Sequence, residues 1–174
     1  SRFESLLSAW SSSDREEVYA YSSAKTYLFS LFFMVQCVLP LRSYFLGDGN
    51  ILWNEDGYRF SWRVMLVEKV GQTQFTVIDK ASNRIWEVNN EDFLTPFQEK
   101  RMAVRPDHIV QYAHFIAQFY KDSFSVSNPS VHVDAWVSLN GRPSQRLIDS
   151  SVNLTEVKRT LKPYDFVLPY KQGT

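Results

Sequence analysis

The chain has 174 residues, and its 19 basic side chains balance 19 acidic ones, so the formal net charge is zero. That length is enough for one globular domain with a buried core. The zero net charge argues against nucleic acid as the main partner, because phosphate binding requires an excess of basic residues. The single cysteine, Cys37, excludes an intrachain disulfide, and its apolar neighbours supply no base to activate it as a nucleophile.

Residues 27–39 form the most apolar stretch of the chain, with apolar side chains at 11 of 13 positions. Because these side chains would surround a helix rather than line one stripe, the pattern indicates burial on every side or contact with lipid. A full membrane span needs about 20 such residues, and Pro40 and Arg42 end the run. A buried core helix and a membrane helix therefore both remain open. Upstream, Ser13 or Asp14 is expected to cap a short helix.

After a turn at residues 47–50, the hydrophobic periodicity changes to two, which predicts strands. Two short joins, at 70–72 and 80–83, are expected to be hairpin turns. The three strands that they would connect are 58–69, 73–79 and 84–88.

The first of these strands has two distinct faces. Large apolar side chains alternate with a mixed set that contains two arginines, Arg59 and Arg63. Arginines beside aromatic rings allow a binding surface for a ligand that is partly anionic and partly apolar, although a half-exposed strand with a solvated face has the same pattern. The apolar face comprises Tyr58, Phe60, Trp62, Val64 and Leu66.

The clearest helix is predicted to begin at Pro106, because proline is favoured at the first helical position and Asp107 suits the first turn. It should end near residues 121–122. Residues 90–105 before it are less regular, and Pro96 interrupts them. The expected apolar face of this helix comprises Ile109, Tyr112, Ala113, Ile116, Phe119 and Tyr120.

Residues 131–139 alternate strongly, and the following Asn140-Gly141 predicts a two-residue hairpin to a return strand at 145–149. Arg146 is expected to pair with Asp134 or Asp149, and the tail at 161–170 looks extended. The predicted fold class is α+β: an antiparallel, β-rich, sandwich-like domain with one amphipathic helix and an N-terminal hydrophobic helix. The expected divisions are a helical segment at 1–46 and a β-rich domain at 47–174.

The sequence offers few constellations that could carry chemistry by themselves. His132 and Asp134 share a strand face, but no third ligand lies at a useful spacing, so we predict no metal site. There is no glycine-rich phosphate loop and no serine elbow for a hydrolase triad.

Several motifs are nevertheless distinctive as a set. They are Leu39-Pro40-Leu41-Arg42, the stretch from Trp53 to Lys69 with its Gly-Tyr-Arg-Phe-Ser-Trp-Arg core, the Pro106-Asp107-His108 helix start, and the stretch from Asp134 to Pro143 followed by Gln145 to Asp149. In this order, from about Ala24 to Tyr170, the chain resembles the C-terminal part of the vitamin K-dependent γ-carboxylase family.

The resemblance implies a bundle of membrane helices followed by a largely β domain on the lumenal or extracytoplasmic side. It implies an enzyme that oxidises vitamin K hydroquinone with O2, uses the strong base so formed to remove a γ-proton from a peptidyl glutamate, and adds CO2. On this basis residues 27–39 are the end of the last membrane helix, in contact with lipid. The family's active-site lysine lies upstream of this chain, which should therefore contain no catalytic residue and be inactive alone.

The resemblance also implies a role for this region in binding a glutamate-containing protein or peptide. Trp53, Tyr58 and Trp62 match aromatic positions that line the glutamate site, Met65 matches a methionine position, and Lys69 falls where a basic residue can pair with the substrate carboxylate. Vitamin K hydroquinone, O2 and CO2 would bind mainly outside this fragment.

One departure from the family pattern supports other interpretations. Val67 stands where arginine or histidine is expected, and losing one of two cations weakens carboxylate binding. It favours a non-catalytic peptide- or lipid-binding module with the same fold. A third possibility is a soluble β domain whose apolar helix is ordinary core.

Overall fold

The structure is a computed structural model that describes residues 23–45, 50–55, 61, 67–160 and 162–171. The chain divides into two compact units, Ser1–Val38 and Leu39–Thr174, which we describe separately. The expected helix cap at Ser13 or Asp14 lies outside the described residues. So does the predicted strand at 58–69, apart from Ser61 and residues 67–69.

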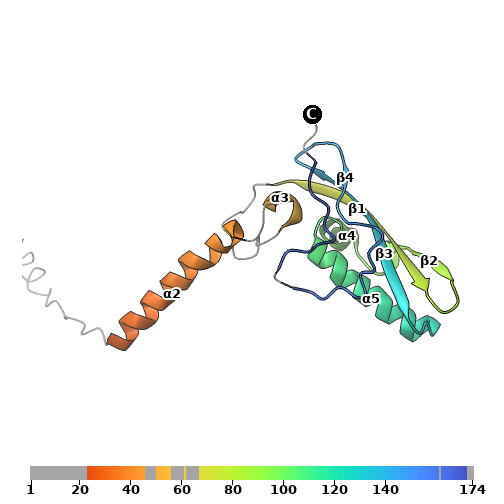
Figure 1. Cartoon of the computed structure of the whole chain (residues 1–174), viewed down its shortest axis with the longest axis horizontal. Coiled ribbons are helices and arrows are strands. Elements are labelled where there is room, and N and C mark those ends of the chain that lie inside the picture. The colour runs from red at the N-terminus through yellow and green to blue at the C-terminus, as the bar shows by residue number, and fades with distance from the viewer. Residues whose placement is uncertain (1–22, 46–49, 56–60, 62–66, 161, 172–174) are drawn as a thin grey trace, which may run out of the picture. The chain divides into compact units, whose positions relative to one another are not determined.

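The second unit is built on a four-stranded antiparallel sheet in the order β2-β1-β3-β4 (Figure 1). Its long central pair, β1 and β3, is in register from Lys69 opposite Leu139 to Asp79 opposite Pro129. The start of β1 is thereby placed beside the end of β3. The strands are β1 (Lys69–Asp79), β2 (Ile85–Val88), β3 (Pro129–Leu139) and β4 (Gln145–Arg146).

The predicted hairpin at 70–72 is wrong, because these residues lie inside β1 and each is paired with β3. The sequence signal was Gly71, which serves close packing and not a turn. A Cβ at Gly71 would lie 2.9 Å from Val137 Cγ2 and 3.2 Å from the carbonyl oxygen of Ala103. The lack of a side chain at Gly71 therefore lets the backbone at Ala103 approach β1 closely.

The two other predicted hairpins are confirmed. Residues 80–83 join the antiparallel strands β1 and β2. Residues 140–144 join β3 to β4, and Asn140 and Gly141 form the turn at its start, with φ angles of 51° and 72° in the left-handed region that such a turn favours. The return strand is shorter than expected, since only Gln145 and Arg146 pair with β3, and Ile148 instead forms a single bridge to Val167.

Helices cover one face of the sheet, so the second layer of the domain is helical (Figure 1). α5 (Pro106–Phe124) confirms the predicted helix, although it continues slightly past its expected end. α4 (Pro96–Met102) lies within residues 90–105, for which the sequence pattern predicted no regular element. Pro96 starts this helix rather than interrupting it, because a proline in the first turn loses no intrahelical hydrogen bond, and Thr95 and Gln98 form a capping box before it.

The core lies between the helical layer and the inward side chains of β1 and β3. Phe75 of β1 is fully buried, and its ring packs edge-on against Tyr112 of α5 with centroids 5.0 Å apart. Of the predicted face of α5, every member is buried except Phe119, which is half-buried. Other buried members of this core are Val77, Val131, Val133, Ala135, Val137, Ile109, Val110, Ala113 and Ile116.

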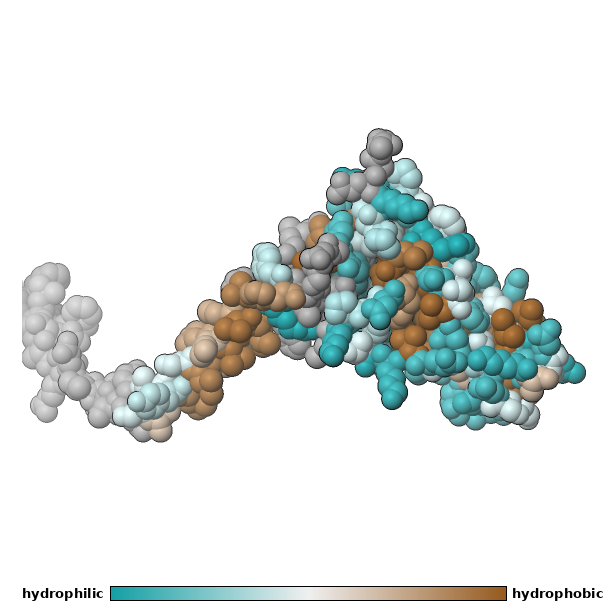
Figure 2. Space-filling model, viewed as in Figure 1, coloured by the Kyte–Doolittle hydropathy of each residue, from teal (hydrophilic) through white to brown (hydrophobic). Residues whose placement is uncertain are grey.

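The apolar N-terminal stretch forms α2 (Ser23–Leu41), the one helix among the described residues that is long and apolar enough to cross a membrane by length and composition. Apolar residues cover most of the face of α2 that Figure 2 shows, and of the residues of this helix only Pro40 is buried. By its length and composition, α2 is consistent with the membrane-helix interpretation of residues 27–39.

Candidate functional site

Lys69, the first residue of β1, is the centre of a small polar cluster inside the second unit. Its side chain is 4% exposed. The ammonium Nζ donates hydrogen bonds to the carbonyl oxygen of Trp53, at 2.6 Å, and to Oε1 of Glu55, at 3.0 Å. Together with Arg105, whose Nε lies 3.8 Å from Oε2 of Glu55, these residues form what we call the Lys69 cluster.

A single helical turn positions Trp53 and Glu55. α3 (Ile51–Asn54) begins where the Asn50 side chain accepts a hydrogen bond from the Leu52 N–H at 3.1 Å. It ends at Glu55, whose φ of 61° is left-handed and whose N–H bonds back to the Ile51 carbonyl oxygen. Ending the helix here places the carbonyl of Trp53 and the carboxylate of Glu55 at the same ammonium.

The Trp53 indole anchors this turn to the C-terminal segment. Trp53 is 1% exposed, and its Nε1 donates to the carbonyl oxygen of Leu168 at 2.7 Å. Its ring packs against that of Tyr170, with centroids 5.1 Å apart. Since its indole N–H has a partner, Trp53 is buried without an unsatisfied donor.

The electrostatics of the cluster depend mainly on burial. Desolvation lowers the pKa of Lys69, the charge and hydrogen bond of Glu55 oppose that change, and Arg105 lowers the pKa further. The Glu55 carboxylate thus lies between an ammonium and a guanidinium, in surroundings where charges interact more strongly than in water. The arrangement is chemically suited to holding a glutamyl carboxylate.

Of the residues predicted for the glutamate site, the structure brings together Trp53 and Lys69. Tyr58, Trp62 and Met65 lie outside the described residues. Val67, where a cation was expected, is half-buried and packs against the hydrophobic core.

Sequence reasoning missed Glu55 and Arg105. Glu55 lies within the motif from Trp53 to Lys69, but the sequence pattern assigned it no role, whereas in the structure it ends a helical turn. No sequence pattern marked Arg105 as a site residue, because it is distant from Glu55 in the chain and lies beside it only in the folded structure.

His132 and Asp134, which share a face of β3, form hydrogen bonds to other residues of the protein. The ring nitrogens of His132 lie 2.9 Å from Oγ of Ser130 and 3.1 Å from the carbonyl oxygen of Ser150. Asp134 accepts a hydrogen bond from Nε of Arg146 at 2.9 Å, which confirms the predicted pairing of Arg146. Among the described residues, no group of three or more His, Cys, Asp or Glu side chains could hold a metal ion.

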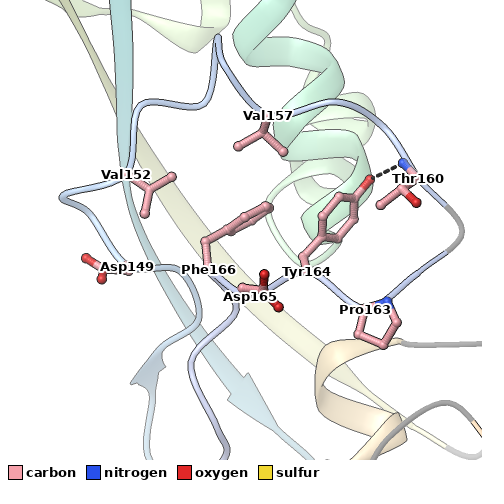
Figure 3. Close-up of a pocket in the computed structure, with 8 residues that line it drawn as sticks. All are labelled: Asp149, Val152, Val157, Thr160, Pro163, Tyr164, Asp165 and Phe166. Carbon is pink, nitrogen blue, oxygen red and sulfur yellow. Dashed lines mark hydrogen bonds between the residues drawn. The ribbon is translucent and has the colours of Figure 1, made fainter.

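The segment after β4 encloses a surface pocket of about 420 Å³ (Figure 3). Tyr164 crosses it: its hydroxyl accepts from the Thr160 N–H at 3.2 Å and donates to Oδ1 of Asp107 at 3.0 Å. The carboxylates of Asp149 and Asp165 line the pocket, and hydrogen bonds from Ser151 hold the pKa of Asp149 below its ordinary value. A pocket lined by two carboxylates does not suit a glutamyl substrate.

These features define an α+β domain with a carboxylate held beside a buried lysine. The chain matches the family model described as vitamin K-dependent gamma-carboxylase, lumenal domain, over residues 21–173. No solved structure matches it. The chain belongs to the vitamin K-dependent gamma-carboxylase lumenal-domain family, which confirms the resemblance seen in its motifs.

Vitamin K dependence is a property of this family in general. The Lys69 cluster does not fit a quinone ring, because Trp53 is 1% exposed and its ring already packs against that of Tyr170. We therefore assign no step through vitamin K to these residues.

Proposed function

We propose that this chain is the extramembrane part, with the adjoining membrane helix, of a γ-glutamyl carboxylase, and that the Lys69 cluster forms part of the wall that receives the substrate glutamyl side chain. The β-rich unit would lie on the lumenal or extracytoplasmic side. The catalytic lysine and the sites for hydroquinone, O2 and CO2 would lie outside this chain. Family membership and the length and composition of α2 support this assignment.

The observation that carries the proposal is the way the cluster binds Glu55. A glutamate carboxylate lies 3.0 Å from Lys69 Nζ through one oxygen and 3.8 Å from Arg105 Nε through the other. These two cations offer a second glutamyl carboxylate the same interactions. Arg105 also supplies the second positive charge that Val67 lacks.

In this proposal the substrate exchanges with Glu55 or binds alongside it. Arg105 is the accessible member of the pair, with a side chain 37% exposed against 4% for Lys69. A substrate carboxylate would first contact Arg105 and then displace Glu55 from Lys69. The exchange replaces one carboxylate with another, so the buried ammonium is never left without a counter-charge.

The role of these residues would be binding and orientation rather than chemistry. Lys69 holds the carbonyl oxygen of Trp53 and the Glu55 carboxylate at one point, and its side chain is almost fully buried. A fixed carboxylate would present its γ-carbon in one orientation to the base formed elsewhere in the enzyme.

The test uses the full-length protein that contains this chain, with a short glutamyl peptide as substrate. Arg105→Gln should raise KM by about tenfold through loss of one charged contact. Glu55→Gln should lower KM, because it removes the internal competitor while an amide still accepts from Lys69. Arg159→Gln, which breaks an exposed arginine–aspartate pair with Asp107, is the matched control and should leave KM unchanged.

Unchanged KM in both Arg105→Gln and Glu55→Gln would exclude the cluster from the glutamate site. The second candidate is a non-catalytic module that binds peptide, which Val67 and the occupation of Lys69 by Glu55 favour. Full-length protein that binds the glutamyl peptide without turnover, in the presence of vitamin K hydroquinone, O2 and CO2, would support this second candidate.

A further inference from the structure

A second pocket, of about 340 Å³, lies where β4 faces the C-terminal segment. Its lining combines a tryptophan ring, a proline and a leucine with two basic side chains. The residues that matter for its chemistry are Trp136, Arg146, Leu168, Pro169 and Lys171, and we call it the Trp136 pocket.

Hydrogen bonds fix the walls of this pocket. The Gln145 side chain donates to the carbonyl oxygen of Lys171 at 2.7 Å and accepts from the Lys171 N–H at 3.0 Å, which attaches the C-terminal segment to β4. Asp134 accepts from Nε1 of Trp136 at 3.0 Å and from Nε of Arg146 at 2.9 Å. Because one carboxylate orients both the indole and the guanidinium, little side-chain freedom remains to be lost on binding.

The charge of the pocket is positive. The guanidinium carbon of Arg146 lies 5.3 Å from the centroid of the Trp136 ring, and Asp134 balances its charge. Among the residues that the structure describes, the ammonium of Lys171 has no hydrogen-bond or ion-pair partner.

This combination suits one kind of ligand. An anionic head group would bind at Lys171 and at the remaining N–H groups of Arg146, and an aliphatic stem would pack on Trp136 and Pro169. Arg146 lies over one face of the Trp136 ring, and the residue is still 38% exposed, so its remaining surface is available for that contact. A glutamyl side chain has both parts, a carboxylate and a short apolar stem.

The pocket adjoins the Lys69 cluster through a short segment. Leu168 lines the pocket, while its carbonyl oxygen accepts from the Trp53 indole at 2.7 Å. Tyr170, between Pro169 and Lys171, packs on Trp53 with ring centroids 5.1 Å apart. The residues from 168 to 171 therefore have the Lys69 cluster on one side and the Trp136 pocket on the other.

We infer that the Trp136 pocket is a docking site for a glutamate-rich segment of the peptide substrate, adjacent to the site for the glutamate that reacts. The inference rests on the proposed function, since it takes the substrate to be a peptide with several glutamates. Binding one glutamate in this pocket would raise the effective concentration of its neighbours at the Lys69 cluster.

The experiment measures binding of a fluorescent peptide with several glutamates to the intact chain in detergent micelles by anisotropy. Lys171→Gln should raise the dissociation constant about two- to fivefold, as expected for one exposed charge pair. Lys171→Arg should restore the affinity. Lys121→Gln removes an exposed lysine in the last turn of α5, which does not line this pocket, and should leave the affinity unchanged.

Three results would overturn the inference. They are unchanged affinity in Lys171→Gln, an equal loss in Lys121→Gln, and equal binding of a peptide in which every glutamate is replaced by glutamine. An effect of Lys171→Gln on binding to anionic lipid vesicles but not on peptide binding would also overturn it, in favour of a lipid head-group site.

The outcome for this pocket is separable from that of the Lys69 cluster. If Lys171→Gln weakens peptide binding while Arg105→Gln and Glu55→Gln leave KM unchanged, the pocket stands and the proposed role of the cluster fails. If KM responds to the cluster variants while Lys171→Gln binds peptide normally, the cluster stands and the pocket fails.

Discussion

Lys69 and Glu55 form an ion pair of 3.0 Å in which the lysine side chain is 4% exposed and the glutamate 20%. The same ammonium donates to the carbonyl oxygen of Trp53 at 2.6 Å. One side chain at the start of β1 therefore holds both the end of α3 and a carboxylate. Replacing Glu55 leaves the buried ammonium without a counter-charge, whereas replacing Lys69 leaves the carboxylate with Arg105 alone, at 3.8 Å.

Lys69→Met is expected to lower the free energy of unfolding by about 2–3 kcal/mol, because it removes the hydrogen bond to Trp53 and leaves Glu55 without its ammonium. This loss of stability is smaller than is usual when a fully buried ion pair is broken, since Glu55 is partly exposed to solvent. Adding Glu55→Gln to Lys69→Met should recover a large part of the loss. Denaturant unfolding followed by tryptophan fluorescence measures both, and equal losses in the single and double variants would contradict this account.

Burial raises the pKa of Tyr112 to about 12, from an ordinary value of 10.0, with smaller contributions from Glu99 and Asp92. A raised folded-state pKa gives stability that is complete below pH 10 and is lost as pH rises from 10 to about 12. Tyr112→Phe should therefore reduce the fall in stability over this range. Melting temperatures of wild type and variant, measured between these two pH values, test the difference.

The same substitution should cost little at neutral pH. Among the described residues, the buried Tyr112 hydroxyl has no hydrogen-bond partner, so removing it leaves no group unsatisfied. Tyr164→Phe is the matched control, because the Tyr164 hydroxyl donates to Asp107 at 3.0 Å. A larger loss in Tyr112→Phe than in Tyr164→Phe would show that the Tyr112 hydroxyl has a partner after all.

Gly71→Ala is expected to destabilise the sheet by about 1–3 kcal/mol, as overpacking does. The new Cβ would lie 2.9 Å from Val137 Cγ2 and 3.1 Å from the carbonyl oxygen of Trp136, which is backbone and cannot move aside. Gly141→Asn is the control: the position is open and left-handed, a conformation that asparagine tolerates. Thermal unfolding compares the two, and a neutral Gly71→Ala would mean that β1 and β3 are further apart than described.

Thr95→Ala should lower stability by about 0.5–2 kcal/mol through loss of the N-cap of α4. The Thr95 hydroxyl accepts from the Gln98 N–H, and the Gln98 side chain accepts from the Thr95 N–H at 2.9 Å. Thr95→Ser keeps the capping oxygen and should retain most of the stability. Urea unfolding distinguishes them, and an equal loss in both would assign the effect to the threonine methyl group.

Local patterns in the sequence were sufficient for much of the fold. Pro106 and the apolar spacing of α5, the alternation of residues 131–139, and Asn140-Gly141 each act through neighbours in the chain, so their conformations could be predicted. Gly71 and Pro96 were misinterpreted for the same reason. Glycine and proline often occur in turns and breaks, but each also has other uses. Gly71 permits close packing against Val137 and Ala103, and Pro96 is in the first turn of α4.

The family and the candidate residues Trp53 and Lys69 could be identified from the sequence, because motifs preserve the order of residue types. Only the tertiary structure placed Glu55 and Arg105 at Lys69, and Lys171 beside Trp136 and Arg146. Charge interactions depend on distances in space and on burial, and pairing of strands distant in the chain determines both. The family could therefore be identified from the order of residues along the chain, whereas the charged clusters that we propose as binding sites form only through contacts between distant segments.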